Sequence, residues 1–76
     1  MTWNEFMELQ ERVDWGEEFN FDYKEEEYWI SQNTDGYYLT RSRDSSTQEF
    51  DTSKDLFEKG KIDGKYLSEI YKDIEW

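Results

Sequence analysis

Apolar residues at helical spacing predict a helix at the start of the chain. Phe6, Leu9 and Val13 recur every three or four residues, which places them on one face of a helix over residues 3–14. The Thr-Trp-Asn-Glu stretch at residues 2–5 has the spacing of a capping box, a side-chain arrangement that begins many helices. We therefore expect an amphipathic first helix whose glutamates face the solvent.

The next part of the chain alternates apolar and polar residues, which predicts antiparallel strands. We expect four strands, over residues 18–24, 27–32, 37–42 and 47–50. The Asp35-Gly36 pair favours a tight turn between the second and third strands. For the first hairpin we place the centre of the turn at Glu25-Glu26, where three consecutive glutamates interrupt the alternation.

The alternation also assigns the two faces of the predicted sheet. The expected turns set Tyr23 opposite Tyr28 and Ile30 opposite Tyr37. One face then holds an apolar set, made of Phe21, Tyr23, Tyr28, Ile30, Tyr37 and Leu39. The other face holds Asn20, Asp22, Trp29, Ser31, Tyr38 and Thr40. A slip of one residue would scatter the apolar set, so we expect the first face to form the core.

The last third of the chain has two helical patterns. A short helix contains Leu56 and Phe57, is capped by one of residues 51–53, and ends at Gly60. Asp63 is the expected N-cap of a final helix, whose apolar stripe is Leu67, Ile70, Tyr71 and Ile74. The predicted fold is thus a single α+β domain over residues 1–76. It is an antiparallel four-stranded meander with an N-terminal helix and two C-terminal helices on one face, in the order α-β-β-β-β-α-α.

The segment EFDTSKDLFEKGKIDGKYLSEIYKDI, with YWIS and GYYLTR before it, resembles small uncharacterised proteins of Gram-positive bacteria and their phages. Those proteins combine an N-terminal helix, aromatic strands and a final helix with the pattern IDGK-x-L-x-E-I. The most specific part of the likeness is Ile62, Asp63, Gly64, Lys65, Leu67, Glu69 and Ile70. The resemblance implies a shared fold over most of the chain, and it implies no site residue because no activity is known for the group. The chain departs from the pattern at Glu25, where such proteins favour glycine.

The composition argues against most catalytic and metal chemistry. The chain has no cysteine and no histidine, which removes thiolate ligands, the commonest general base and the commonest metal ligand. Carboxylates such as Asp51 with Asp55, or Asp63 with Glu69, lack the spacing of a calcium loop. We therefore expect a non-enzymatic protein with no catalytic residue, no cofactor and no metal. The chain begins with Met1 and has no apolar run near the ~18 residues of a membrane span, so we expect a complete cytoplasmic protein that does not contact membranes.

The net charge of −11 is concentrated in the first third of the chain. Residues 1–27 hold ten acidic and two basic residues, a net charge of −8, whereas residues 28–76 carry −3. Direct binding of nucleic acid needs a basic surface, so this distribution argues against it. A surface of this sign favours a basic protein partner.

The candidate partner-binding residues are eight carboxylates with two aromatic anchors. The carboxylates are Glu8, Glu11, Glu17, Glu18, Asp22, Glu25, Glu26 and Glu27, which could form one continuous acidic field. Trp29 and Tyr38 are expected as cross-strand neighbours on the open face, and Trp3, Trp15 and Trp76 would extend that surface. The alternatives are that the charges only solvate the protein, that the aromatic pair only stiffens the sheet, or that the last helix covers this face.

Two functions fit these features. The first is an acidic interaction module, in its sharpest form a phage-type inhibitor that mimics nucleic-acid phosphates and blocks a basic nucleic-acid-binding protein, as inhibitors of restriction and CRISPR enzymes do. The second is a small housekeeping or toxin-neutralising (immunity) protein whose acidic surface only provides solubility. In both cases we expect a monomer or a weak dimer.

Overall fold

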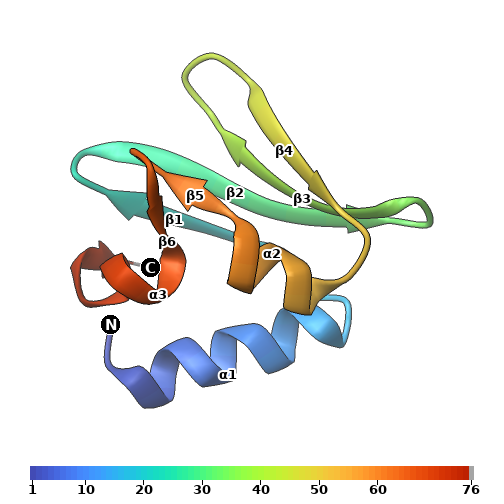
Figure 1. The fold of residues 1–76 in the computed structure, drawn as a ribbon, viewed down its shortest axis with the longest axis horizontal. Coiled ribbons are helices and arrows are strands. Elements are labelled where there is room, and N and C mark those ends of the chain that lie inside the picture. The colour runs from blue at the N-terminus through green and yellow to red at the C-terminus, as the bar shows by residue number, and fades with distance from the viewer. Residues whose placement is uncertain (76) are drawn as a thin grey trace.

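The computed structural model describes residues 1–75, which form an antiparallel sheet with the helices of that range packed on one face (Figure 1). The five strands of the sheet lie in the order β4-β3-β2-β1-β7. Their bounds are Phe19–Tyr23 for β1, Glu26–Asn33 for β2, Gly36–Arg41 for β3, Ser46–Phe50 for β4 and Ile74–Glu75 for β7. The α+β class is confirmed. The predicted four-stranded meander is present as β1 to β4, and β7 extends it beyond β1.

The helices and a small second hairpin complete the fold. The helices are α1 (Trp3–Asp14), α2 (Ser53–Lys59), α3 (Leu67–Ile70) and the 3₁₀-helix η1 (Tyr71–Asp73). The strands β5 (Lys61–Ile62) and β6 (Lys65–Tyr66) pair only with each other. Within residues 1–75, none of these helices has the length and apolar content that crossing a membrane requires.

Helix α1 has the predicted bounds and the predicted capping box. The Thr2 hydroxyl accepts from the Glu5 backbone nitrogen at 3.1 Å, and the Glu5 carboxylate accepts from the Thr2 backbone nitrogen at 2.8 Å. At the other end, the Gln32 side-chain amide of β2 donates to the Val13 carbonyl at 3.1 Å. At each end of the helix, a side chain therefore forms a hydrogen bond with a backbone group that has no partner within the helix. These bonds help to hold the apolar stripe of the helix against the sheet.

The predicted apolar face is the core. Its residues Phe21, Tyr23, Tyr28, Ile30 and Leu39 are buried, and Tyr37 is half-buried against them. Phe6 of α1 lies at the centre of the helical layer, with its ring 5.8 Å from that of Phe57 and 5.3 Å from that of Tyr71. The buried side chains of the sheet and helices form one contiguous cluster.

The predicted strand pairs are wrong by two residues in both hairpins. Phe21 rather than Tyr23 lies opposite Tyr28, and Leu39 rather than Tyr37 lies opposite Ile30. The first turn is therefore centred on Lys24-Glu25, one residue earlier than expected. A shift by an even number of residues keeps every side chain on its face, so the alternation predicts the faces and leaves the pairing open.

The predicted long final helix is also wrong. Asp63 is not an N-cap: it and Gly64 have φ values of 53° and 76° and form the tight turn between β5 and β6. Both residues need a positive φ in this type of turn, and an Asp-Gly pair adopts it readily. Helix α3 has only four residues, and Ile74 pairs with Tyr23 in the sheet. The apolar stripe is correctly placed in the core, but it spans a short helix, a 3₁₀-helix and a strand.

Candidate interaction surface on the open sheet face

The sheet face opposite the helices is uncovered within the described residues (Figure 1). It consists of the residues predicted for it, which include Asn20, Asp22, Trp29, Tyr38 and Thr40. The alternative in which the last helix covers this face is wrong, because α3 packs on the core side with Leu67 and Ile70 buried. Asn20, Asp22 and Trp29 are consequently exposed to solvent.

Three carboxylates on this face form a line across three strands. Asp22 of β1 lies directly opposite Glu27 of β2 on one side and directly opposite Glu75 of β7 on the other. Neighbouring strands are ~4.8 Å apart, so this acidic row (Asp22, Glu27 and Glu75) extends over roughly 10 Å. Together with Asn20 and Phe21, the acidic row lines a shallow hollow of about 290 Å³.

The acidic row has no cationic partner in the part of the chain that the structure describes: none of its carboxylates forms an ion pair there. Lys24 lies nearby and places its ammonium 5.4 Å from the centre of the Tyr23 ring. Like charges directly opposite each other on a sheet destabilise it. The stability of the sheet therefore does not explain the acidic row.

Glu75 is the residue that sequence reasoning missed. Ile74 and Glu75 form a two-residue strand, which is too short for alternation to distinguish it from the end of a helix. Its pairing with β1 joins residues that lie about fifty positions apart in the sequence, which no local pattern reveals. A second hollow, of about 500 Å³, adjoins this position and is lined by Asp22, Lys24, Glu25, Asp73 and Glu75.

Trp29 lies beside the acidic row, two residues along β2 from Glu27. Its side chain is 40% exposed, although it belongs to the central part of the sheet. The expectation that it directly faces Tyr38 is wrong, because Trp29 pairs with Thr40 and Tyr38 pairs with Ser31. The Tyr38 hydroxyl instead donates to the Asn33 side chain at 2.9 Å. Trp29 is therefore the aromatic group next to the carboxylates.

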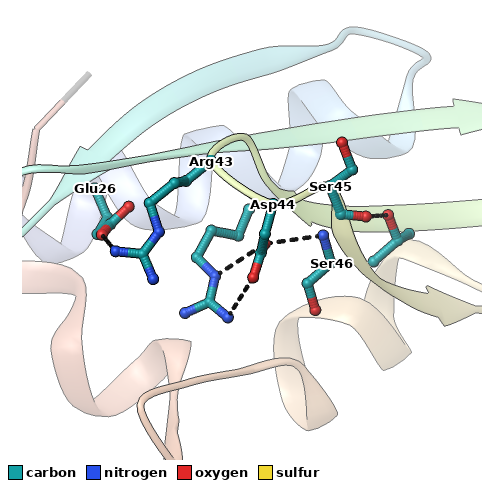
Figure 2. Close-up of polar contacts among 7 residues, drawn as sticks. Glu26, Arg43, Asp44, Ser45 and Ser46 are labelled. Atoms are coloured by element: carbon teal, nitrogen blue, oxygen red, sulfur yellow. Dashed lines mark hydrogen bonds and ion pairs between the residues drawn. The ribbon is translucent and has the colours of Figure 1, made fainter.

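The other predicted carboxylates are separated from this face or neutralised. Glu8 and Glu11 are exposed on α1, on the opposite side of the sheet from the acidic row. Glu17 accepts from the Arg12 guanidinium at 2.8 Å and raises the pKa of Arg12. Glu26 points to the helix side and pairs with Arg43 at 2.9 Å (Figure 2).

Of the remaining two predicted carboxylates, Glu18 is exposed just before β1 and Glu25 is exposed at the tip of the first hairpin. The predicted carboxylates are therefore divided between two faces of the molecule rather than forming one continuous field, and the open face keeps Asp22 and Glu27 with Glu25 at its edge.

The remaining tryptophans do not extend the open face. Trp3 is half exposed on the helix side, with its ring 5.2 Å from that of Tyr71. Trp15 follows the last residue of α1 and is 74% exposed. Trp76 lies outside the described residues.

Comparison with known proteins gives no relative to guide the assignment. No protein-family model matches the chain, and neither the curated proteins nor the solved structures contain a significant match. Among residues 1–75, no three carboxylates are grouped so that they could hold a metal ion. The functional assignment therefore rests on the geometry of the open face.

Proposed function

We propose that this protein is a non-enzymatic interaction module that binds a basic protein through its open sheet face. The observation that carries the proposal is the acidic row, three carboxylates on adjacent strands with no cationic partner in residues 1–75. Closely spaced carboxylates attract lysine and arginine side chains and speed the encounter with a basic surface. The Trp29 indole beside them offers an apolar anchor and a ring face for a cation.

In its sharper form, the proposal is that the acidic row imitates nucleic-acid phosphates. Each strand of B-DNA carries one charge per ~3.4 Å of helix rise, and the carboxylates of the row follow each other at the comparable strand spacing of ~4.8 Å. The net charge of −11 adds a long-range field of the same sign. The partner would then be a nucleic-acid-binding protein, and this chain would inhibit it by occupying its groove.

The competing function is a small housekeeping or immunity protein whose acidic residues only provide solubility. Glu8 and Glu11 suit that role, because they are dispersed on the exposed side of α1. The acidic row suits it less well. Solubility requires charge anywhere on the surface, whereas carboxylates placed directly opposite each other weaken the sheet.

Two matched triple variants separate these functions. The first neutralises the acidic row with Asp22→Asn, Glu27→Gln and Glu75→Gln. The second neutralises three exposed carboxylates elsewhere, with Glu8→Gln, Glu11→Gln and Glu18→Gln. Both raise the net charge from −11 to −8. In affinity capture from cell lysate, the first should lose a basic partner that wild type and the second retain. Equal capture by both variants, or equal loss, would contradict a role for the open face.

A competition experiment tests the mimicry. Once a captured partner is purified, duplex DNA should displace this protein from it, and raising the salt concentration should weaken both interactions. Simultaneous binding of DNA and this protein would rule out mimicry while leaving the basic-partner proposal intact.

A further inference from the structure

The two edges of the described sheet differ in how they are protected. β7 has two residues, whereas β4 has five and pairs with β3 along its whole length without a bulge. Folded proteins usually protect an edge with a short strand, a bulge, a proline or a lysine, because the unpaired backbone groups of an edge can bind another strand. β4 contains neither proline nor lysine. The outer edge of β4 is therefore a candidate site for an added strand.

The pairing pattern identifies which backbone groups of β4 face outward. The Ser42 backbone nitrogen donates to the Glu27 carbonyl at 3.0 Å, which makes these residues a hydrogen-bonded pair of the antiparallel ladder. Because such pairs alternate, every second residue of β3 bonds to β2, and the residues between them bond to β4. The β4 residues that form those bonds are Ser46, Gln48 and Phe50. The N–H and C=O groups of Thr47 and Glu49 therefore point away from β3, and both residues are exposed.

The neighbouring elements fix β4 in place and leave its outer edge open. The Gln48 side-chain amide donates to the Lys61 carbonyl at 2.6 Å and accepts from the Lys61 backbone nitrogen at 2.9 Å. Gln48 lies opposite the buried Leu39, so this contact with β5 is on the helix side of the sheet and not at its edge. In residues 1–75, no strand pairs with β4 on the side away from β3 (Figure 1). The edge is thus an extended backbone that is already held in the conformation a further strand requires.

The side chains at the end of β4 indicate the charge of the occupant. A hollow of about 380 Å³ is lined there by Asp35, Gly36, Tyr38, Glu49, Phe50 and Asp51. Its lining contains three carboxylates and no basic residue, and none of the three forms an ion pair within residues 1–75. Glu49 lies directly opposite Tyr38 on the open face, so a cation beside Glu49 would also meet an aromatic ring. The edge is therefore complementary to a basic segment.

We propose that the β4 edge binds an extended, basic segment of a protein partner by adding it to the sheet as a further strand. The N–H and C=O groups of Thr47 and Glu49 each form a backbone hydrogen bond with the added strand. Every second side chain of that strand lies on the open face, where a lysine or arginine pairs with Glu49. A second copy of this chain fits less well, because each copy carries a net charge of −11.

This site is separate from the acidic row of the proposed function. The acidic row lies on β2, β1 and β7, whereas the β4 edge lies at the other end of the sheet, beyond β3. The two sites also use different groups, because the acidic row offers only side chains and the β4 edge offers backbone donors and acceptors. Each site can therefore be removed without the other, and failure of one proposal leaves the other standing.

The test follows amide hydrogen exchange of the ¹⁵N-labelled protein at physiological salt. The probe is a peptide of about seven residues that alternates lysine and threonine, and its matched control carries a methyl group on every lysine backbone nitrogen, which keeps the charge and removes those donors. The probe should slow exchange of the Thr47 and Glu49 amides roughly tenfold or more, and the control should not. Unchanged exchange at both amides, or equal slowing by the two peptides, would overturn the proposal. Slow exchange without peptide that increases with protein concentration would also overturn it, because it would assign the edge to a second copy.

Matched variants make the test specific. Glu49→Gln should weaken peptide binding several-fold, whereas Glu58→Gln removes the same charge from an exposed position on α2 and should leave binding unchanged. Thr47→Pro removes an outward N–H, which an edge strand tolerates, and should weaken binding, whereas Thr47→Val keeps that N–H and should not. Neutralising the acidic row should leave the slowed exchange in place. Equal binding by the Glu49→Gln and Glu58→Gln variants, or loss of the slowed exchange when the acidic row is neutralised, would contradict the assignment.

Discussion

Replacing Glu25 by glycine in the first hairpin turn should stabilise the protein. Lys24 and Glu25 have φ values of 50° and 66°, so both occupy the left-handed region although both carry a β-carbon. The flanking pair, Tyr23 opposite Glu26, fixes a two-residue turn between β1 and β2. Such turns favour Asn-Gly because glycine adopts a positive φ without steric cost. The sheet therefore holds the turn in a conformation that these two residues disfavour.

The size of the effect follows from two opposing terms. The left-handed conformation raises the energy of a residue with a β-carbon by ~1–2 kcal/mol, and glycine avoids this steric strain. Glycine also increases the conformational entropy of the unfolded chain, which lowers the free energy of unfolding by about 0.4–1 kcal/mol and offsets part of this gain. The net gain for Glu25→Gly is thus about 1 kcal/mol, which for a domain of this size corresponds to a rise in Tm of ~4–8 °C.

Thermal unfolding followed by circular dichroism measures this difference, with Glu25→Gln as the control. The glutamine variant removes the same charge and keeps the β-carbon, so it isolates the electrostatic contribution. We expect the glycine variant to melt several degrees above the glutamine variant. Equal melting temperatures for the two variants would refute the idea that backbone strain is stored in this turn.

Three further predictions concern the acidic row, the core and the buried phenol. Glu27→Gln should raise the free energy of unfolding, measured by urea denaturation, by roughly 0.2–1 kcal/mol, because it removes the repulsion between Glu27 and Asp22. This gain should become smaller at high salt, which screens the repulsion. A loss of stability would show that the two carboxylates do not repel each other. Phe6→Ala should lower the free energy of unfolding by ~3–5 kcal/mol, because the Phe6 ring contacts the rings of Phe57 and Tyr71. Near-ultraviolet circular dichroism at 37 °C should then show that the aromatic side chains have lost their fixed packing. An unchanged spectrum would contradict the position of Phe6 at the centre of the helical layer. Burial raises the pKa of Tyr28, so the folded state holds the phenol proton more tightly than the unfolded state, and stability should fall as the pH rises above 10 and through the folded-state pKa. Urea midpoints between pH 9 and 11 should fall less steeply for Tyr28→Phe than for wild type, and identical slopes would contradict the shift.

The sequence predicts the two faces of the sheet but not the pairs within it. Alternation fixes which side of the sheet Tyr28 and Trp29 occupy, because a slip of one residue would bury the polar set. A slip of two residues keeps both faces intact, so only the turn distinguishes the registers. The first turn contains Lys24 and Glu25, which lack the asparagine or glycine that marks such a turn in other sequences.

The candidate site could be predicted only in part, because contacts between distant parts of the chain add one carboxylate to it and neutralise another that was predicted for it. Asp22 and Glu27 follow from the alternation of their strands. Glu75 joins them only because the end of the chain pairs with β1, a contact that no local pattern encodes. Arg43 reaches back from the loop after β3 to neutralise Glu26, which a charge count along the sequence cannot reveal.

The most direct test of the proposed function is to map where a basic ligand touches the protein. A ¹⁵N-labelled sample would be titrated with an arginine-rich peptide of about ten residues at low salt, and amide and indole shifts would be followed. The account predicts that shifts concentrate on Asp22, Glu27, the Trp29 indole and Glu75, and that neutralising the acidic row removes them. Shifts centred on α1 around Glu8 and Glu11, or the same shifts after the acidic row is neutralised, would contradict it.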